Sequence, residues 1–284
     1  MIAPFAFLGS DYDEQLKEVY TSISTKDIIR RNSIMGILTS NESFADSKPL
    51  IKMIRKSISF SMLQQIGAAH DQGRRLYIGT THMDAQRLVV WNMGLIAKIG
   101  KEEALELFQK VMLASASIPV AMPPVYFDIE INGEKYDEMH TDGGTTTQVF
   151  FHANTIDLSE AAKTVGIESF NRFANLYVIR NGQTSSVPEQ VDRNIQAISA
   201  RTLDTSIKAS ALNNLYRMYV FANRDKSRIF YTDIPGEYVS ESDEPFDRDE
   251  MQRLFSVGVD LGSSPAPWHD DLPGIGEIHG NNPN

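Results

Sequence analysis

The chain has 284 residues, 42% of them hydrophobic and 23% charged, a composition typical of globular rather than disordered proteins. Its 37 acidic against 27 basic residues give a net charge of −10, which argues against a nucleic-acid partner because phosphate backbones are bound by clustered Lys and Arg. The absence of cysteine excludes disulfides, thiolate nucleophiles and Cys-ligated zinc, and it leaves the cellular compartment open.

The first seventy residues are predicted to be helical. The apolar opening at 2–8 lacks a basic flank and is predicted to be buried core rather than a signal peptide. Apolar spacing then predicts four helices, over residues 14–20, 25–38, from Asp46 with Pro49 in the first turn, and 62–69. No apolar run approaches the roughly 18 residues of a transmembrane helix, so we expect any membrane contact of these residues to be peripheral.

Strands are predicted to begin after the helix-ending signal Gln72-Gly73. We expect a strand over 74–81, a second over 87–91, a helix over 101–114 with 3.6-residue apolar spacing, and a third strand over 125–131. Asn132-Gly133 is a strong hairpin signal, and the chain is predicted to return as a strand from Lys135.

The rest of the chain mixes helices with short strands. We predict an apolar stretch at 149–151, helices over 159–165 and 247–257, strands over 176–180 and 229–232, and mostly helical structure over 187–223. Interleaved helices and strands favour an α/β fold with a mostly parallel sheet covered on both faces. The expected division is an α/β domain over 1–155, a mainly helical extension over 156–260 and a disordered tail over 261–284.

Asp142-Gly143-Gly144 is the candidate functional motif, because two glycines after a strand can make a tight turn that redirects a carboxylate. Asp-Gly is also a common turn, so the motif alone favours a structural role. Its surroundings favour a functional one. The segment Ala114-Ser115-Ala116-Ser117-Ile118-Pro119, then Pro123-Pro124-Val125, a hairpin and Asp142-Gly143-Gly144, resembles the second conserved block of the patatin-like phospholipases.

The resemblance covers Ile2 to about His152, including a core strand at Arg75–Thr81, and it implies a three-layer α/β fold. It implies a lipid acyl hydrolase that cleaves carboxylic esters through a Ser-Asp dyad and an acyl-enzyme, with Asp142 as the base and Gly143 and Gly144 forming its turn. No metal or nucleotide cofactor is implied. The expected partner is a lipid or another carboxylic ester, with peripheral membrane contact.

The nucleophile of such a dyad is missing from the chain. The serine would lie on a G-x-S-x-G elbow, and none occurs between Met1 and Asn284. Met1–Leu8 resembles the helix that follows the elbow in the family, so we expect the chain to begin inside the domain. The alternative is a catalytically inactive remnant or lipid-binding module that retains the fold.

Other candidate residues favour structural roles. His140 pairs with Asp142 by spacing, but no third ligand is spaced in sequence to complete a metal site, so no metal is predicted. His82 with Asp84, and the tail residues His269 and His279, are predicted to be a hydrogen-bonded loop pair and a solvated segment. Ser115 and Ser117 lack elbow glycines, and no G-x-G-x-x-G or Walker sequence supports a nucleotide.

Overall fold

The computed structural model describes residues 2–31, 43, 45–148, 175–224, 227–242, 244 and 246–270. Within these residues the chain is mixed α/β, as predicted. It divides into two compact units, one formed by Met1–Thr146 with Glu241–Phe255 and the other by Thr147–Ser240 with Ser256–Asn284. No helix in the described part of the chain is both long and apolar enough to cross a membrane.

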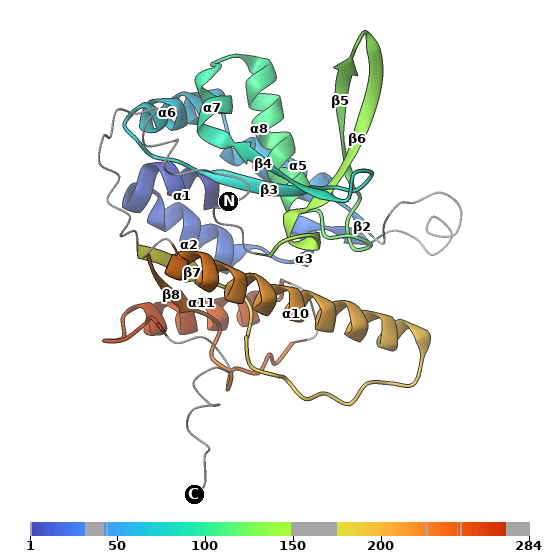
Figure 1. Ribbon diagram of the computed structural model, residues 1–284, viewed down its shortest axis with the longest axis vertical. Coiled ribbons are helices and arrows are strands. Elements are labelled where there is room, and N and C mark those ends of the chain that lie inside the picture. Colours follow the sequence, from blue (N-terminus) through green and yellow to red (C-terminus); the bar gives the residue numbers. More distant parts are fainter. Residues whose placement is uncertain are drawn as a thin grey trace, which may run out of the picture. The chain divides into compact units, whose positions relative to one another are not determined.

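Helices form the start of the first unit (Figure 1). They are α1 (Ile2–Leu8), the 3-10 turn η1 (Gly9–Tyr12), α2 (Asp13–Ser22), α3 (Thr25–Ile28), α5 (Lys48–Ser57) and α6 (Phe60–Asp71). The apolar start is confirmed as core, since α1 buries Ala3, Pro4 and Phe7. The helix end predicted at Gln72-Gly73 is confirmed, with Gly73 at φ +99°.

The helix predicted over 25–38 is confirmed only over its first turn, α3, and is wrong for the described residues after Ile28. Ser24 and Asp27 form a capping box that starts α3, but the chain becomes extended at Ile29. Arg30–Arg31 then form β1, which pairs antiparallel with β2 (Ala45–Asp46). The β-branched pair Ile28-Ile29 favours this change to extended backbone. Residues 32–38 of the prediction lie outside the described residues.

A four-stranded sheet follows, in the order β4-β3-β6-β5. Its strands are β3 (Tyr77–His82), β4 (Arg87–Asn92), β5 (Val125–Ile131) and β6 (Glu134–Asp142). Every pairing is antiparallel, so the expectation of a mostly parallel sheet is wrong here. Tight turns join β3 to β4 and β5 to β6, and a connection that short can only join antiparallel strands. Asn132 and Gly133 both have positive φ, as the predicted hairpin turn requires.

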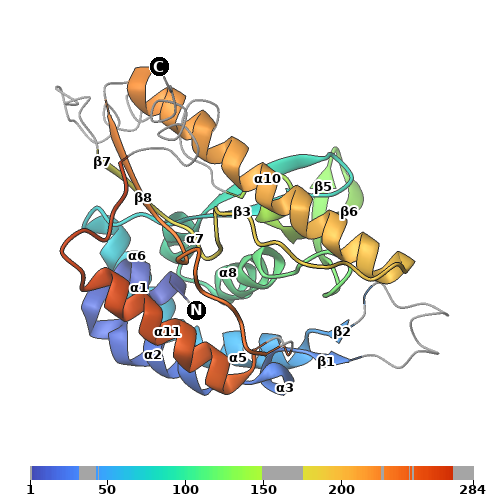
Figure 2. The same ribbon diagram turned by 90° about the horizontal axis from the view of Figure 1, so that it is seen from below.

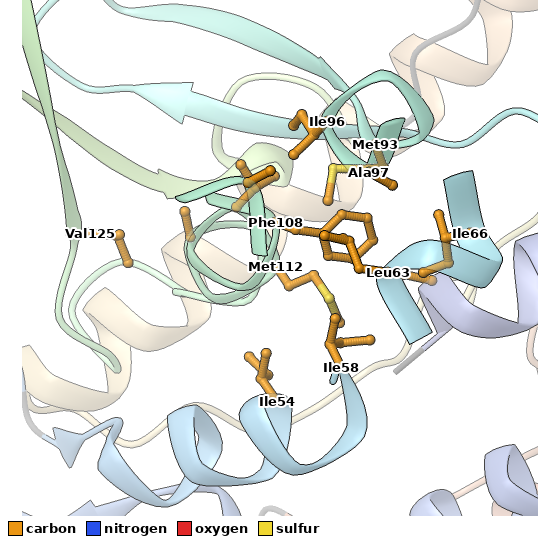
Figure 3. Packing of buried hydrophobic residues seen from close by; sticks show 14 of the residues in the cluster. Ile54, Ile58, Leu63, Ile66, Met93, Ile96, Ala97, Phe108, Met112 and Val125 are labelled. Carbon is orange, nitrogen blue, oxygen red and sulfur yellow. The ribbon is translucent and has the colours of Figure 1, made fainter. Parts of the chain in front are cut away.

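The main core of the first unit lies between the helices that connect β4 to β5 and the N-terminal helices. Helix α8 (Glu102–Ser115) confirms the helix predicted over 101–114, whereas the short α7 (Met93–Lys98) was not predicted. Figure 3 shows Phe108 of α8 beside Leu63 and Ile66 of α6, with Met112 one turn further along α8, facing Ile58. Phe108, Ile58, Leu63 and Ile66 are fully buried, so α8 holds α6 and the end of α5 in one apolar cluster.

The second unit has its own smaller core. Strands β7 (Asn175–Ile179) and β8 (Arg228–Thr232) are parallel and are connected through α10 (Ile195–Arg224). Leu176, Val178 and Ile229 of the strands pack with Leu215 and Met218 of α10. Helix α11 (Arg248–Gly262) begins in the first unit and ends in the second, and His269 then pairs with Tyr231 of β8. The predictions at 149–151, 159–165 and 271–284 lie outside the described residues.

Candidate functional site

Asp142 is the last residue of β6, where two hydrogen bonds and one strand partner position its backbone. Within the sheet it pairs with Thr80 of β3. Its N–H donates to the carbonyl oxygen of Ser117 at 2.9 Å, and the Thr81 hydroxyl donates to its carbonyl oxygen at 2.9 Å. Two segments far apart in sequence, β3 and the loop after α8, therefore position the predicted site residue.

The two glycines after Asp142 have different roles. Gly143 is buried, and a Cβ atom there would lie 2.5 Å from the carbonyl oxygen of Gly79, so β3 and the turn approach too closely for any side chain. Gly144 contributes its N–H, which donates to Asp142 Oδ1 at 2.6 Å. The motif thus combines a close backbone approach with a donor that orients the carboxylate.

The Asp142 carboxylate is half-buried, and burial raises its pKa, an effect that the Gly144 N–H partly offsets. Among the described residues, no donor or cation contacts its Oδ2 atom. A desolvated carboxylate with one oriented and one open oxygen has a higher proton affinity than an exposed one. These are the properties that proton abstraction requires of a general base.

A hydrogen-bonded chain crosses the sheet beside Asp142. The indole N–H of Trp91 donates to Thr80 Oγ1 at 2.8 Å, and Thr80 Oγ1 lies 2.8 Å from His140 Nδ1. His140 Nε2 lies 3.2 Å from Glu138 Oε2. Because an ionised Glu138 can only accept, neutral His140 carries its proton on Nε2 and accepts from Thr80 through Nδ1. The fully buried His140 therefore links β4, β3 and β6.

His82 completes a group that sequence spacing did not reveal. Its ring stacks on His140 at 5.1 Å with an 8° interplanar angle, and its Nε2 lies 3.5 Å from Asp84 Oδ2. The two residues are close, as predicted, but His82 is a buried residue at the end of β3 rather than a loop residue. His82, Glu138 and His140 thus meet across two strands, so the third ligand judged missing from the sequence comes from β3. Asp142, the partner suggested by spacing, is not in the group.

The geometry of this group favours hydrogen bonding over metal binding. Its potential ligand atoms lie only within 4.8 Å of one another, whereas ligands of a tetrahedral zinc ion are roughly 3.5 Å apart. The lone pairs of two parallel rings do not converge on one point. Both ring nitrogens of His140 are already occupied. We therefore assign the group to ordering the sheet next to Asp142.

The buried neutral His140 predicts a loss of stability in acid. Burial lowers its pKa, with Glu138 opposing and His82 reinforcing the shift. Below about pH 6.5, His140 becomes protonated in the unfolded chain but stays neutral in the folded protein. The free energy of unfolding should therefore fall by up to ~1.4 kcal/mol for each unit by which the pH decreases. Urea unfolding between pH 7.5 and 5.5 should show this slope, and it should be shallower in His140→Asn. The matched control His269→Asn, at an exposed position, should keep the original slope; equal slopes in all three proteins would contradict the assignment.

Ser115 is the last residue of α8, and Ser117 lies in the loop that follows. Ser117 is fully buried, and its hydroxyl donates to the Leu113 carbonyl oxygen at 2.9 Å. Its own carbonyl oxygen accepts the Asp142 N–H. A hydroxyl fixed in this way faces the helix rather than a substrate, in agreement with the structural role predicted from the sequence.

The second unit contains a cavity of about 550 Å³ that sequence reasoning missed. Arg180, Arg201 and Lys208 are among its lining residues. All three donate to backbone carbonyl oxygens of the loop between β7 and α10, at Gln183, Val187 and Ser185. The cations therefore hold that loop against α10, and their contacts supply a structural role without a ligand.

Comparisons with known proteins place the chain in no family. No protein-family model matches the sequence. A search of the curated proteins likewise finds no match.

Proposed function

We propose that this chain is the base-bearing part of a patatin-like lipid acyl hydrolase, in which Asp142 is the base of a Ser-Asp dyad. The observation that carries the proposal is the Asp142 carboxylate itself, which is desolvated, oriented through Oδ1 and open at Oδ2. In the proposed reaction Oδ2 takes the serine proton, the alkoxide attacks the ester carbonyl, and an acyl-enzyme forms with release of the alcohol. Water then releases the acid.

The contact between Ser117 and Asp142 supports the proposal. The resemblance to patatin-like phospholipases rests on a block that runs from the end of α8 to Asp142-Gly143-Gly144, and these two ends are hydrogen-bonded to each other. A turn that only reversed the chain would not require Gly143 to lie so close to the backbone of Gly79. The proposal extends the mixed α/β architecture to the family's three-layer fold.

The proposal requires a nucleophile from outside the 284 residues, because they hold no G-x-S-x-G. The hydroxyl of that serine would have to come within about 3 Å of Asp142 Oδ2. By resemblance, α1 would follow the elbow that carries it. The alternative function is a lipid-binding module that keeps the fold without the chemistry, and the missing elbow is the observation that favours it.

A serine-reactive phosphonate distinguishes these functions. The 284-residue chain and a version extended by the upstream reading frame would be treated with a fluorophosphonate and assayed with p-nitrophenyl butyrate. We expect covalent labelling and ester hydrolysis only in the extended protein, with the label on a serine of a G-x-S-x-G. Stoichiometric labelling of the 284-residue chain would place the nucleophile elsewhere, beginning with Ser115. An extended protein that binds lipid but neither labels nor hydrolyses would establish the alternative.

A further inference from the structure

Helix α5 has a strongly basic face in an otherwise acidic protein. Four of its ten residues are basic and none is acidic, whereas the whole chain has a net charge of −10. We call Lys48, Lys52, Arg55 and Lys56 the basic face. Lys48, Lys52 and Arg55 are three, four or seven positions apart and Lys56 is four positions after Lys52, so all four lie on one side of the helix. Leu50 and Ile54, on the other side, are buried in the core.

The charges of the basic face are mostly unpaired. Lys48 lies 3.4 Å from Asp46, which also pairs with Arg30 of β1 at 3.3 Å. Within the described part of the chain, no carboxylate pairs with Lys52, Arg55 or Lys56, and all three are exposed. Figure 2 shows α5 beside α3, whose acidic residue Asp27 is engaged by Ser24.

The helix dipole explains only half of this pattern. Cations are favourable at a helix C-terminus, which accounts for Arg55 and Lys56 in the last turn. Lys48 is the first residue of α5, where the dipole disfavours a cation, and Lys52 is in the middle, where the dipole contributes little. Because Lys48 already pairs with Asp46, a second reason is needed only for Lys52.

The same face has a shallow hollow with an apolar component. Its volume is about 320 Å³, and Lys48, Ile51, Lys52 and Arg55 line it. Ile51 is half-buried between the three cations. Long basic side chains lay their methylene stems on apolar surface and extend their charges outwards. The hollow therefore combines an apolar surface with surrounding positively charged side chains.

We propose that the basic face of α5 docks on an anionic lipid bilayer. Phosphate groups of the lipids would contact Lys48, Lys52, Arg55 and Lys56, while glycerol or upper acyl carbons would contact Ile51. A nucleic acid also offers phosphate groups, but it has no acyl chain that could contact Ile51 in the hollow. The choice of lipid over an acidic protein rests on the proposed function, which places the ester substrate in a lipid surface.

Vesicle sedimentation of the 284-residue chain tests the proposal. We expect binding to vesicles of phosphatidylcholine with 30% phosphatidylglycerol, weak binding to pure phosphatidylcholine, and loss of binding in high salt. Lys52→Glu with Arg55→Glu should weaken binding by more than about 30-fold, because each of the two lost basic side chains is worth roughly fivefold in affinity near an anionic surface and the new carboxylates are repelled by it. The neutral pair Lys52→Gln with Arg55→Gln should weaken binding less. This neutral variant replaces the charge-reversed variant in the test if the latter fails to fold.

Lys101→Glu with Lys135→Glu is the matched control, because it makes the same charge change at exposed residues of other elements. An equal loss of binding in the control, or equal binding to both vesicle types, would overturn the proposal. So would binding to the polyanion heparin without binding to vesicles. Hydrolysis of soluble p-nitrophenyl butyrate by the extended protein should be unchanged by the α5 variants, whereas Asp142→Asn should leave vesicle binding intact. Failure of this inference and failure of the proposed function are thereby distinguishable.

Discussion

Asp142→Asn in the upstream-extended protein is expected to lower ester hydrolysis by about 10⁴-fold or more, because nucleophile and base act as one unit. Asparagine has nearly the same shape, and its side-chain oxygen can still accept from the Gly144 N–H, so the turn should persist. It cannot take up the serine proton. The turnover number for p-nitrophenyl butyrate measures the loss, and fluorophosphonate labelling should slow in parallel.

Glu138→Gln provides the matched control for that variant. Glu138 lies four residues earlier on the same face of β6, but its carboxylate contacts His140 rather than the open side of Asp142. We expect Glu138→Gln to keep most of the activity. If Asp142→Asn retained activity while its thermal unfolding was unchanged, another group would be the base, and the dyad assignment would be wrong.

Phe108→Ala is expected to destabilise the first unit by about 3–5 kcal/mol, the usual cost of removing a buried aromatic ring. The ring is fully buried among Leu63 and Ile66 of α6 and Met93 of α7, and these two helices are held by other contacts that keep them from closing the cavity completely. Urea unfolding followed by the fluorescence of Trp91 measures the effect, in a Trp268→Phe background so that only the first unit reports.

The exposed neighbour Glu106 gives a control on the same helix. Glu106→Ala should change the free energy of unfolding by no more than about 0.5 kcal/mol, since it leaves the core untouched. A loss below about 1 kcal/mol for Phe108→Ala would show that the helices around it repack freely, and that α8 does not hold the cluster together.

The sequence predicted the elements whose signals are local. Helix α8 followed from the spacing of its own apolar residues, and the β5–β6 turn followed from Asn132-Gly133. Strand direction was not predictable in this way, because the pairing of β3 with β6 joins residues about sixty positions apart. A helix-rich sequence between two strands suggested a parallel crossover, yet two helices, α7 and α8, return the chain in the antiparallel sense.

The candidate site was predicted in part. Asp142 and its glycines were found from their motif. A glycine is required at position 143 because the backbone of Gly79 leaves no room for a side chain, and no local sequence pattern reveals that contact. Trp91 and Thr80 come from other strands and carried no signal of their own, and His82 was noted only as a partner of Asp84. Glu138 did carry one, because residues 138, 140 and 142 alternate along a strand and so share a face.

In the described part of the chain, the β5–β6 hairpin meets β3 at its base alone, through residues 139–142 of β6. Residues 130–137, on both sides of its turn, are exposed. During evolution the tip can therefore lengthen or shorten in pairs of residues with little effect on the sheet. A single residue gained or lost between His140 and Asp142 would instead turn the carboxylate to the opposite face. Variation among descendants of this gene should accumulate at the tip, while the count of residues at the base stays constant.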